Sequence, residues 1–316
     1  MLRNVIRRTI EISQSPVHLS ARLGQLILRP KTPNTPGPDV AEPLSTPQPA
    51  SFPCEDIGLI LVEHPQTTYT HQALVALMDH GAAVVVCGPK HLPVGLLLPL
   101  QTHTEVVWRI AEQIAAPRPL LKRLWQQIVR AKILAQARNL PADSLARRRI
   151  TALAQQVRSG DPANVEAQAA RAYWQTMFGQ TFRRNPDAEN GINASLNYGY
   201  AILRAAVARA LVVAGLFPAL GIHHRNRSDA FALADDLVEP LRPLVDAQVR
   251  DRLLHPQLTQ GLDQTAKARL LELLTTTVRL EETTGPLMVA LHRMCASLVE
   301  CYQRQRKRIL IPEAVN

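Results

Sequence analysis

The sequence predicts an α+β protein in which a small N-terminal β-rich domain, residues 1–101, precedes a larger all-α domain, residues 102–316. In the first part, short apolar runs are bounded by Gly and Pro, which is typical of buried strands. After about residue 102, apolar residues recur at helical spacing through long segments. Aromatic residues make up only 4% of a chain rich in Ala, Leu and Val, a composition that favours helices over a large β-sandwich core.

The N-terminal part contains candidate strands, one candidate helix and a proline-rich segment. Residues 1–29 alternate loosely between apolar and polar types and predict short strands joined by turns. Residues 30–53 carry eight prolines, so we expect a flexible loop or linker there. The runs "DIGLILVE" and "GAAVVVCGP" predict buried strands, and "HQALVALMDHG" between them predicts a short helix closed by Gly81.

The C-terminal part consists of segments with helical periodicity, and no internal repeat is visible among them. The predicted helices are "TEVVWRIAEQI", "PLLKRLWQQIVRAKILAQARNL", "PANVEAQAARAYWQTMF", "INASLNYGYAILRAAVARALVVAGL", "AFALADDLVEPLRPLVDAQVRDRLL", "TAKARLLELLTTTVRL" and "TGPLMVALHRMCASLVECYQRQRKR".

The charge balance indicates a polyanionic partner. Lys and Arg number 36 against 26 for Asp and Glu, a net charge of +10, which favours nucleic acid or an anionic membrane surface as the partner. No apolar run reaches the roughly 18 residues that a membrane span needs. The start "MLRNVIRRTI" lacks the apolar centre of a signal peptide, and the four cysteines show no metal-binding spacing. We therefore expect a reduced, soluble, cytoplasmic protein.

A carboxylate lies near the start of one predicted helix. In "SGDPANVEAQAARAYWQTMF", Asp161 followed by proline is a helix-start signal. Glu166 then shares one helical stripe with Tyr173 and further apolar residues. An alternative to a functional role is a glutamate at the edge of the core, paired with Arg171 or Arg209.

A second acidic group lies in "GIHHRNRSDAFALADDLVEP", residues 221–240. On a helix, Asp236 and Glu239 share a face at i and i+3, while Asp235 and Glu239 are neighbours at i+4, so spacing alone does not choose between the aspartates. Pro240 is expected to kink the helix beyond the acids. The alternative is an acidic edge neutralised by arginines, for which the candidates are Arg225, Arg227 and Arg242.

These acids occur in the half of the chain that also carries clustered basic residues, at 147–149, 183–184 and 304–308. A basic surface that follows phosphates, together with an inward-facing set of carboxylates and histidine, indicates metal-assisted chemistry on a phosphodiester.

Three segments together resemble the Cas1 family, the CRISPR-associated integrase of spacer acquisition, and the resemblance is nearest to members that accompany type II systems. The segments are "KHLPVGLLLPL", "GDPANVEAQAARAYWQTMFGQTFRR" and "GINASLNYGYAILRAAVARALVVAGLFPALGIHHRNRSDAFALADDLVEPLRP". By this resemblance, Glu166, His224 and Glu239 surround a divalent cation, Mg²⁺ or Mn²⁺, with Asp236 as an auxiliary acid. His224 is preferred over His223 because of its separation from Glu239. The proline-rich insert is longer than expected for the family, and Ala232 stands where a second polar residue was expected.

The resemblance also implies a reaction and partners. The 3′-hydroxyl of a captured DNA fragment attacks a phosphodiester at the edge of a CRISPR repeat, and with water as nucleophile the same site cleaves DNA. We expect double-stranded DNA, a second copy of the chain and a small ferredoxin-like Cas2 protein as partners, with a type II effector nuclease and accessory subunit beyond them. The expected DNA contacts are Arg171, Arg225 and Arg242, with Tyr173 and Asn197 holding the site or touching the substrate.

Two other classes of protein compete with this hypothesis. A non-catalytic helical DNA-binding or scaffold protein explains the charge and the helices, but it leaves the acidic groups without a purpose. A metal-dependent hydrolase of small phosphoesters explains the acids, but it needs no basic surface.

Overall fold

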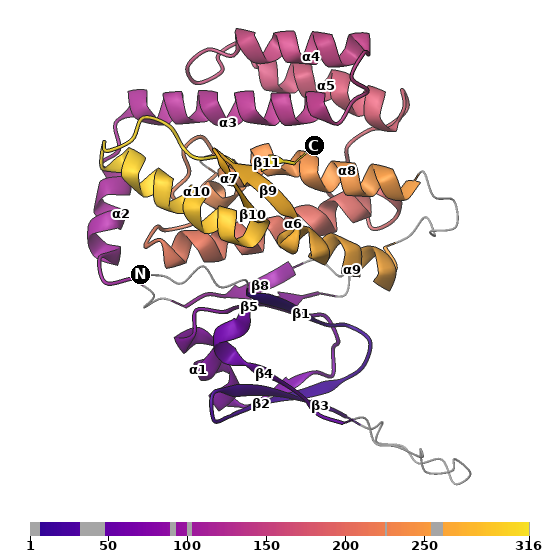
Figure 1. Ribbon diagram of the computed structural model, residues 1–316, viewed down its shortest axis with the longest axis vertical. Coiled ribbons are helices and arrows are strands. Elements are labelled where there is room, and N and C mark those ends of the chain that lie inside the picture. Colours follow the sequence, from indigo (N-terminus) through magenta and orange to yellow (C-terminus); the bar gives the residue numbers. More distant parts are fainter. Residues whose placement is uncertain are drawn as a thin grey trace. The chain divides into compact units, whose positions relative to one another are not determined.

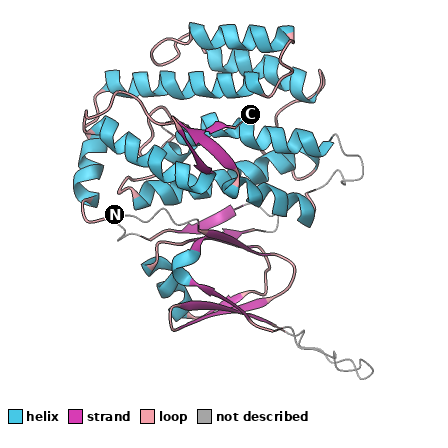
Figure 2. Ribbon diagram, viewed as in Figure 1, coloured by secondary structure: helices cyan, strands magenta, loops and turns pink. Residues whose placement is uncertain are grey.

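The computed structural model describes residues 7–31, 48–88, 93–99, 103–224, 226–253 and 262–315 (Figure 1). The chain forms two compact units, Met1–Thr102 and His103–Asn316. Figure 2 shows strands as the main elements of the first unit and helices as those of the second. The predicted α+β class, with N-terminal strands and a mostly helical remainder, is confirmed.

The described part of the first unit contains two four-stranded sheets. In the sheet of order β1-β5-β7-β8, the first three strands are parallel and β8 is antiparallel. The other sheet has the order β4-β3-β2-β6. The bounds are β1 (Arg8–Ile12), β2 (Val17–Arg22), β3 (Gln25–Pro30), β4 (Ala50–Pro53), β5 (Ile57–Val62), β6 (Thr68–Tyr69), β7 (Ala83–Cys87) and β8 (Pro93–Leu97), with a 3-10 turn at Cys54–Asp56.

Strand β5 lies at the centre of its sheet. All six residues of its sequence, IGLILV, are buried, as expected for a parallel strand paired on both edges. Helix α1 (His71–Asp79) begins after Thr70, whose side chain accepts a hydrogen bond from the Ala73 N–H at 3.1 Å. Gly81 follows with φ of +71°, the left-handed conformation that ends a helix. The strands and the helix predicted in this region are confirmed.

The proline-rich segment differs in part from its prediction. Residues 32–47 lie outside the described residues, but Ala50–Pro53 form strand β4, paired antiparallel with β3. The expectation of a loop throughout 30–53 is therefore wrong at its end. Pairing with β3 places Phe52 opposite Leu26, against the core of the unit, and Pro53 is the last residue of an edge strand, where a missing N–H is tolerated.

The second unit is built mainly from helices. Helix α3 packs on α4 and α5, and α6 packs on α7, α8, α9 and α10. The bounds are α2 (Val106–Ile114), α3 (Arg118–Arg138), α4 (Leu145–Gln156), α5 (Val165–Phe178), α6 (Gly191–Val213), α7 (Ala232–Val238), α8 (Arg242–Leu253), α9 (Gln264–Glu272) and α10 (Leu287–Tyr302), with 3-10 turns η2 (Glu239–Leu241) and η3 (Leu273–Thr275).

The predicted all-α character of residues 102–316 is wrong near the C-terminus. A three-stranded sheet of order β10-β9-β11 forms from β9 (Thr277–Leu280), β10 (Thr283–Pro286) and β11 (Glu313–Ala314). Leucines at helical spacing led to the prediction of one continuous helix through "LLELLTTTVRL". The β-branched run at its end instead favours a strand, and β9 alternates between exposed and buried residues.

Helix α6 is the central helix of this unit. It is long and apolar enough to span a membrane, with a mean hydropathy of 1.2, but 78% of its most apolar window is buried within the structure, as in the core helix of a globular protein. Gly199 on α6 allows α8 to approach closely, since a Cβ atom at that position would lie 2.4 Å from the Val245 side chain. This packing fixes α8 and the residues that precede it.

Candidate functional site

Glu166 is held in the first turn of α5. The helix begins after Asn164, whose side chain accepts from the Ala167 N–H at 3.3 Å. The sequence placed the helix start at Asp161, three residues earlier, and this was wrong because Asp161 has a φ of +47° and lies in the preceding turn. Its carboxylate still accepts from the N–H groups of Val165 and Glu166, at 2.9 and 3.0 Å. Five residues before Glu166, Asp161 therefore stabilises the helix end that carries it.

Glu239 is placed by a change of helix type. Helix α7 ends at Val238, and Pro240 lies within the 3-10 turn η2 before α8 begins. Proline has no N–H to continue the α-helical bonding, so the predicted kink is present at this position. The turn packs on α3 and leaves the Glu239 side chain only 9% exposed.

Lys132 of α3 joins the two glutamates. Its ammonium donates to Glu166 Oε1 at 2.5 Å and also to Glu239 Oε2. The Lys132 side chain is 12% exposed and that of Glu166 is 22% exposed, so the group is shielded but not sealed. Arg242 adds a second cation, with its Nε donating to Glu239 Oε1 at 2.9 Å. The carboxylates of Glu166 and Glu239 thus converge on one cation, the ammonium of Lys132.

The charges in this group stabilise one another. Burial by itself would raise the pKa of Glu239, but Lys132 and Arg242, with a smaller effect of His224, lower that pKa to about 2. Burial would lower the pKa of Lys132, but the carboxylates of Glu239 and Glu166 raise it above its ordinary value. Lys132 and Glu239 are therefore both charged at neutral pH.

His224 lies beside this group and is oriented by Asp236. The Nδ1 of His224 is 2.6 Å from Asp236 Oδ1. A carboxylate can only accept, so Nδ1 carries a proton, and in the neutral form of the ring the lone pair lies on Nε2. The hydrogen bond with Asp236 is the largest cause of a raised pKa of His224, which burial opposes and the charge of Glu239 supports. The pKa values of Glu239 and His224 thus influence each other.

The Asp236 carboxylate does not lie where the prediction of an auxiliary acid beside Glu239 placed it. This carboxylate is fully buried and also accepts from the backbone N–H groups of His223 and His224, at 2.8 and 3.3 Å. It therefore turns toward the histidine loop and not toward Glu166, so it is not an auxiliary metal ligand in this arrangement. Asp235 pairs with Arg204 at 2.6 Å, and the His223 ring stacks on Trp125 at a centroid distance of 4.1 Å.

The three predicted metal ligands are brought together only in part. Glu166 and Glu239 meet at Lys132, whereas the imidazole of His224 is bonded to Asp236. Within the ranges that the structure describes, no three His, Cys, Asp or Glu side chains are grouped as a ready metal site. The ligand set of Glu166, His224 and Glu239 therefore stays a prediction.

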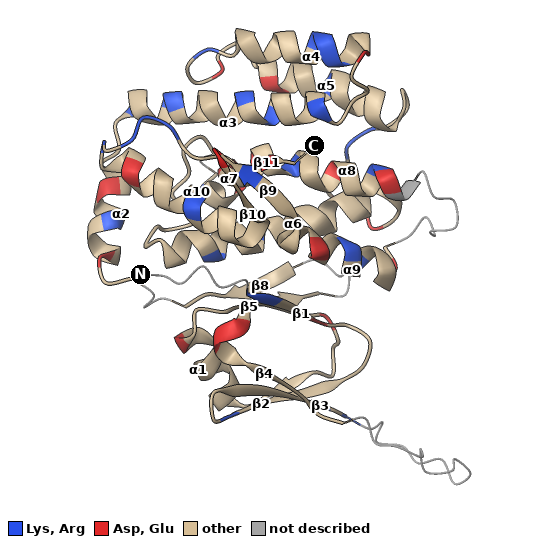
Figure 3. Ribbon diagram, viewed as in Figure 1, with Lys and Arg blue, Asp and Glu red and all other residues tan. Residues whose placement is uncertain are grey.

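The predicted DNA contacts divide into exposed and buried side chains. Arg171 is exposed on α5, and Arg225 lies outside the described residues. Tyr173 is fully buried and Asn197 is 8% exposed, so a direct DNA contact by either is not supported. Figure 3 shows basic segments along α3 and α4, on the same side of this unit as α5.

A buried carboxylate next to the site was missed by the sequence reasoning. Asp246 Oδ2 accepts from the Tyr173 hydroxyl at 3.0 Å, and its Oδ1 accepts from the Tyr200 hydroxyl. The Arg242 guanidinium lies 4.4 Å from the centre of the Tyr200 ring. Burial raises the pKa of Asp246 to about 7, although the two hydroxyl groups oppose the shift. Asp246 holds Tyr200, the Tyr200 ring contacts Arg242, and Arg242 in turn binds Glu239.

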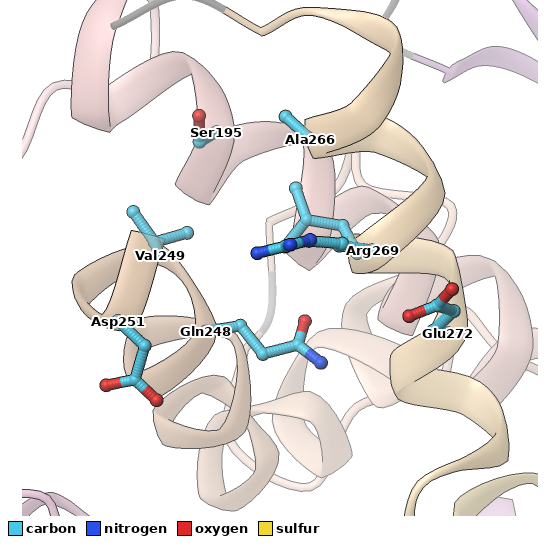
Figure 4. A pocket seen from close by; sticks show the side chains of 8 residues that line it. Ser195, Gln248, Val249, Asp251, Ala266, Arg269 and Glu272 are labelled. Carbon is cyan, nitrogen blue, oxygen red and sulfur yellow. The ribbon is translucent and has the colours of Figure 1, made fainter. Parts of the chain in front are cut away.

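A cavity of about 400 Å³ lies elsewhere in this unit, between α6, α8 and α9 (Figure 4). It includes none of the predicted catalytic residues. Its lining is Ser195, Gln248, Val249, Asp251, Ala266, Arg269, Leu270 and Glu272.

Comparisons with known proteins agree with this fold. The model of the family described as CRISPR associated protein Cas1 matches residues 42–275. The chain is 40% identical over 266 residues to the CRISPR-associated endonuclease Cas1 of Neisseria meningitidis serogroup C, covering 83% of this chain and 87% of that one. It is 28% identical to the CRISPR-associated endonuclease Cas1 2 of Pyrobaculum aerophilum, covering 79% of this chain and 88% of that one.

Solved structures share the fold. A casposase bound to its integration product has a TM-score of 0.77 at 17% identity, covering 96% of this chain and 93% of that one. A chain of a Cas6-RT-Cas1–Cas2 complex has a TM-score of 0.73 at 17% identity, covering 97% of this chain and 36% of that one.

Proposed function

The chain belongs to the Cas1 family of CRISPR-associated proteins, and we propose that it joins the 3′-hydroxyl ends of captured DNA fragments to phosphodiesters at a CRISPR repeat. The family match and the identity to a Cas1 endonuclease support integrase and endonuclease chemistry. The observation that carries the assignment of the site is the convergence of Glu166 and Glu239 on one cation.

A divalent cation fits this group by the chemistry of its donors. The ammonium of Lys132 already acts as a stand-in cation between the two carboxylates, which are the ligand type that Mg²⁺ and Mn²⁺ prefer. Glu166, Glu239 and the free Nε2 of His224 would hold the ion. When bound, it supplies Lewis-acid polarisation of a phosphate oxygen and stabilises charge on the attacking and leaving oxygens.

The residues of the chain have distinct roles in this proposal. Asp236 fixes the proton of His224 on Nδ1, which leaves Nε2 available as a donor atom. Arg242 and the tyrosine–Asp246 network hold Glu239 in place and ionised. In strand transfer, a DNA 3′-hydroxyl forms the new ester bond and the repeat strand leaves with a 3′-hydroxyl of its own, so no protein nucleophile is needed. With water in place of the hydroxyl, the reaction is DNA hydrolysis.

The proposed partners follow from charge and from the family. A net charge of +10 supports contacts with the DNA backbone of prespacer and repeat, with Arg171, which is exposed on the helix that carries Glu166, as a candidate. A homodimer, a Cas2 partner and a cytoplasmic location are proposed, as are contacts with a type II effector nuclease and its accessory subunit. The structural neighbour that contains Cas2 supports the Cas2 partner by fold alone.

The test is the joining of a labelled duplex oligonucleotide to a supercoiled plasmid that carries the repeat, in Mg²⁺, in Mn²⁺ and in EDTA. We expect joining in the metals and none in EDTA. Glu166→Gln, Glu239→Gln and His224→Ala should each lower joining by at least about 100-fold, while DNA affinity stays within a few fold. The control is Glu282→Gln, which changes an exposed glutamate in a turn.

Two results would contradict the proposal. Wild-type joining rates in Glu166→Gln or His224→Ala would remove these residues from the site. Equal DNA binding in EDTA and Mg²⁺, without joining or cleavage under any condition, would favour the non-catalytic scaffold.

A further inference from the structure

While the site holds no metal, two cations neutralise the two glutamates that would bind one. In the structure, Glu166 and Glu239 carry two negative charges, and Lys132 and Arg242 carry two positive ones. A divalent cation bound between the carboxylates adds two positive charges in a shielded place. Such an excess is costly unless an anion joins it or one of the cations moves away.

Lys132 is the cation that can move. Arg242 is held by Glu239 on one side and by the Tyr200 ring on the other, at 2.9 and 4.4 Å. For Lys132, by contrast, the bonds to the two carboxylates are the polar contacts that hold the ammonium, and these are the atoms that a metal ion would take. The backbone of α3 is fixed by packing on α4 and α5 and by Arg130 Nε, which donates to the Ala154 carbonyl at 3.1 Å. The change is therefore confined to the flexible side chain.

The partly exposed side of the group gives the ammonium a way out. The Glu166 side chain is 22% exposed whereas that of Glu239 is 9% exposed, so the group is more open to solvent on the side of Glu166. Glu166 lies in the first turn of α5, the helix on which Arg171 is exposed. An ammonium released from the pair would emerge at this partly exposed side, beside α3, along which Figure 3 shows basic segments.

We propose that Lys132 alternates between two partners: it neutralises Glu166 and Glu239 in the metal-free protein, and it contacts a phosphate of the DNA once a divalent cation replaces it. This inference rests on the proposed function. With Lys132 and Arg242 retained, the divalent cation and these two side chains carry two more positive charges than the two glutamates carry negative ones, which complements the charge that accumulates on a phosphodiester during transfer. Lys132 would then hinder metal binding before DNA arrives and assist the reaction afterwards.

The first measurement is metal affinity without DNA, which does not depend on activity. Lys132→Met and Lys132→Gln should bind Mn²⁺ at least about tenfold more tightly than the wild type in calorimetric titration, since the competing cation is gone. The metal-induced rise in melting temperature should also be larger in these variants. Lys122→Met, an exposed lysine on the same helix, is the matched control and should bind Mn²⁺ as the wild type does.

The second measurement is strand transfer at saturating Mn²⁺. Lys132→Met should join DNA at least about tenfold more slowly despite its tighter metal binding, and Lys132→Arg should recover part of the rate, because it keeps a cation for the phosphate. A lysine with a structural role alone would not combine tighter metal binding with slower joining.

A third measurement needs no variant. Reductive methylation of the wild-type protein, read by mass spectrometry, should modify Lys132 slowly in EDTA and faster in Mn²⁺, while Lys122 reacts equally in both. Equal Mn²⁺ affinity of wild type and Lys132→Met, or protection of Lys132 in both conditions, would overturn the inference while leaving the integrase function intact. Failure of the proposed function would instead appear as absent joining by the wild type.

Discussion

The role of Asp236 leads to the sharpest test of the site. The sequence offered it as an auxiliary acid beside Glu239, whereas the structure places it behind His224. Asp236→Asn keeps the size of the side chain but removes the charge and one acceptor. When the amide NH₂ faces Nδ1 it can only donate, so the proton of His224 moves to Nε2 and occupies the lone pair that the proposed metal ion would use.

The size of the effect follows from what Asp236 contacts. It is fully buried and accepts three hydrogen bonds, at 2.6, 2.8 and 3.3 Å. Groups that orient a metal-binding histidine typically change metal affinity or activity by about 10- to 100-fold. We therefore expect joining to fall by this factor, which corresponds to about 1.4–2.7 kcal/mol in the activation free energy.

Two assays check this expectation. Single-turnover joining rates at saturating DNA measure the loss, with Asp235→Asn as the control because Asp235 is paired with Arg204 instead. In the metal-free protein, NMR titration of His224 should show a lower pKa in Asp236→Asn than in the wild type, since the hydrogen bond with Asp236 is the main cause of the raised pKa. A joining rate in Asp236→Asn equal to the wild type, or a larger loss in Asp235→Asn, would refute this reasoning.

Three further predictions concern stability and DNA binding. Burial raises the pKa of Asp246 from 3.8 to about 7, so the folded state retains a proton that the unfolded state releases, and the free energy of unfolding should fall as pH rises from about 4 to 7. Asp246→Asn should flatten this fall in urea titrations at pH 5 and 8, and an equally steep fall would count against a raised pKa. Gly199→Ala should destabilise by about 1–3 kcal/mol in urea, because its Cβ would lie 2.4 Å from Val245, while Gly285→Ala, which meets nothing within 4 Å, should change little. Arg171→Gln should lower the slope of log affinity for DNA against log salt by about one in fluorescence anisotropy, and an unchanged slope would place Arg171 outside the DNA interface.

Local patterns in the sequence were enough to predict most elements. Strand β5 and helix α1, which Gly81 follows, depend on residues adjacent in the chain, so short stretches of sequence are enough to predict them. The same reasoning failed where two local preferences compete. In "LLELLTTTVRL", leucines at helical spacing run into β-branched residues, and pairing with β10 and β11 decided in favour of a strand.

For the site, the sequence predicted which residues carry chemistry, and the tertiary structure determined which groups they contact. Glu166, His224 and Glu239 could be selected from their types, their spacing and the family resemblance. Lys132 could not, because it lies 34 residues from Glu166 and 107 residues from Glu239, and a lysine on a basic helix has no distinguishing pattern. Asp246 likewise carries no signal until Tyr173 and Tyr200 are folded around it.

The physical reason is the range of the interactions involved. Helix and strand preferences act over a few residues, and a chain records them in its periodicity. Charge neutralisation and hydrogen bonding in a shielded site act between groups that meet only after helices pack. The sequence predicted that Asp236 accompanies Glu239, but the packing of η2 against α3 brings Lys132 to Glu239, and Asp236 binds His224 instead.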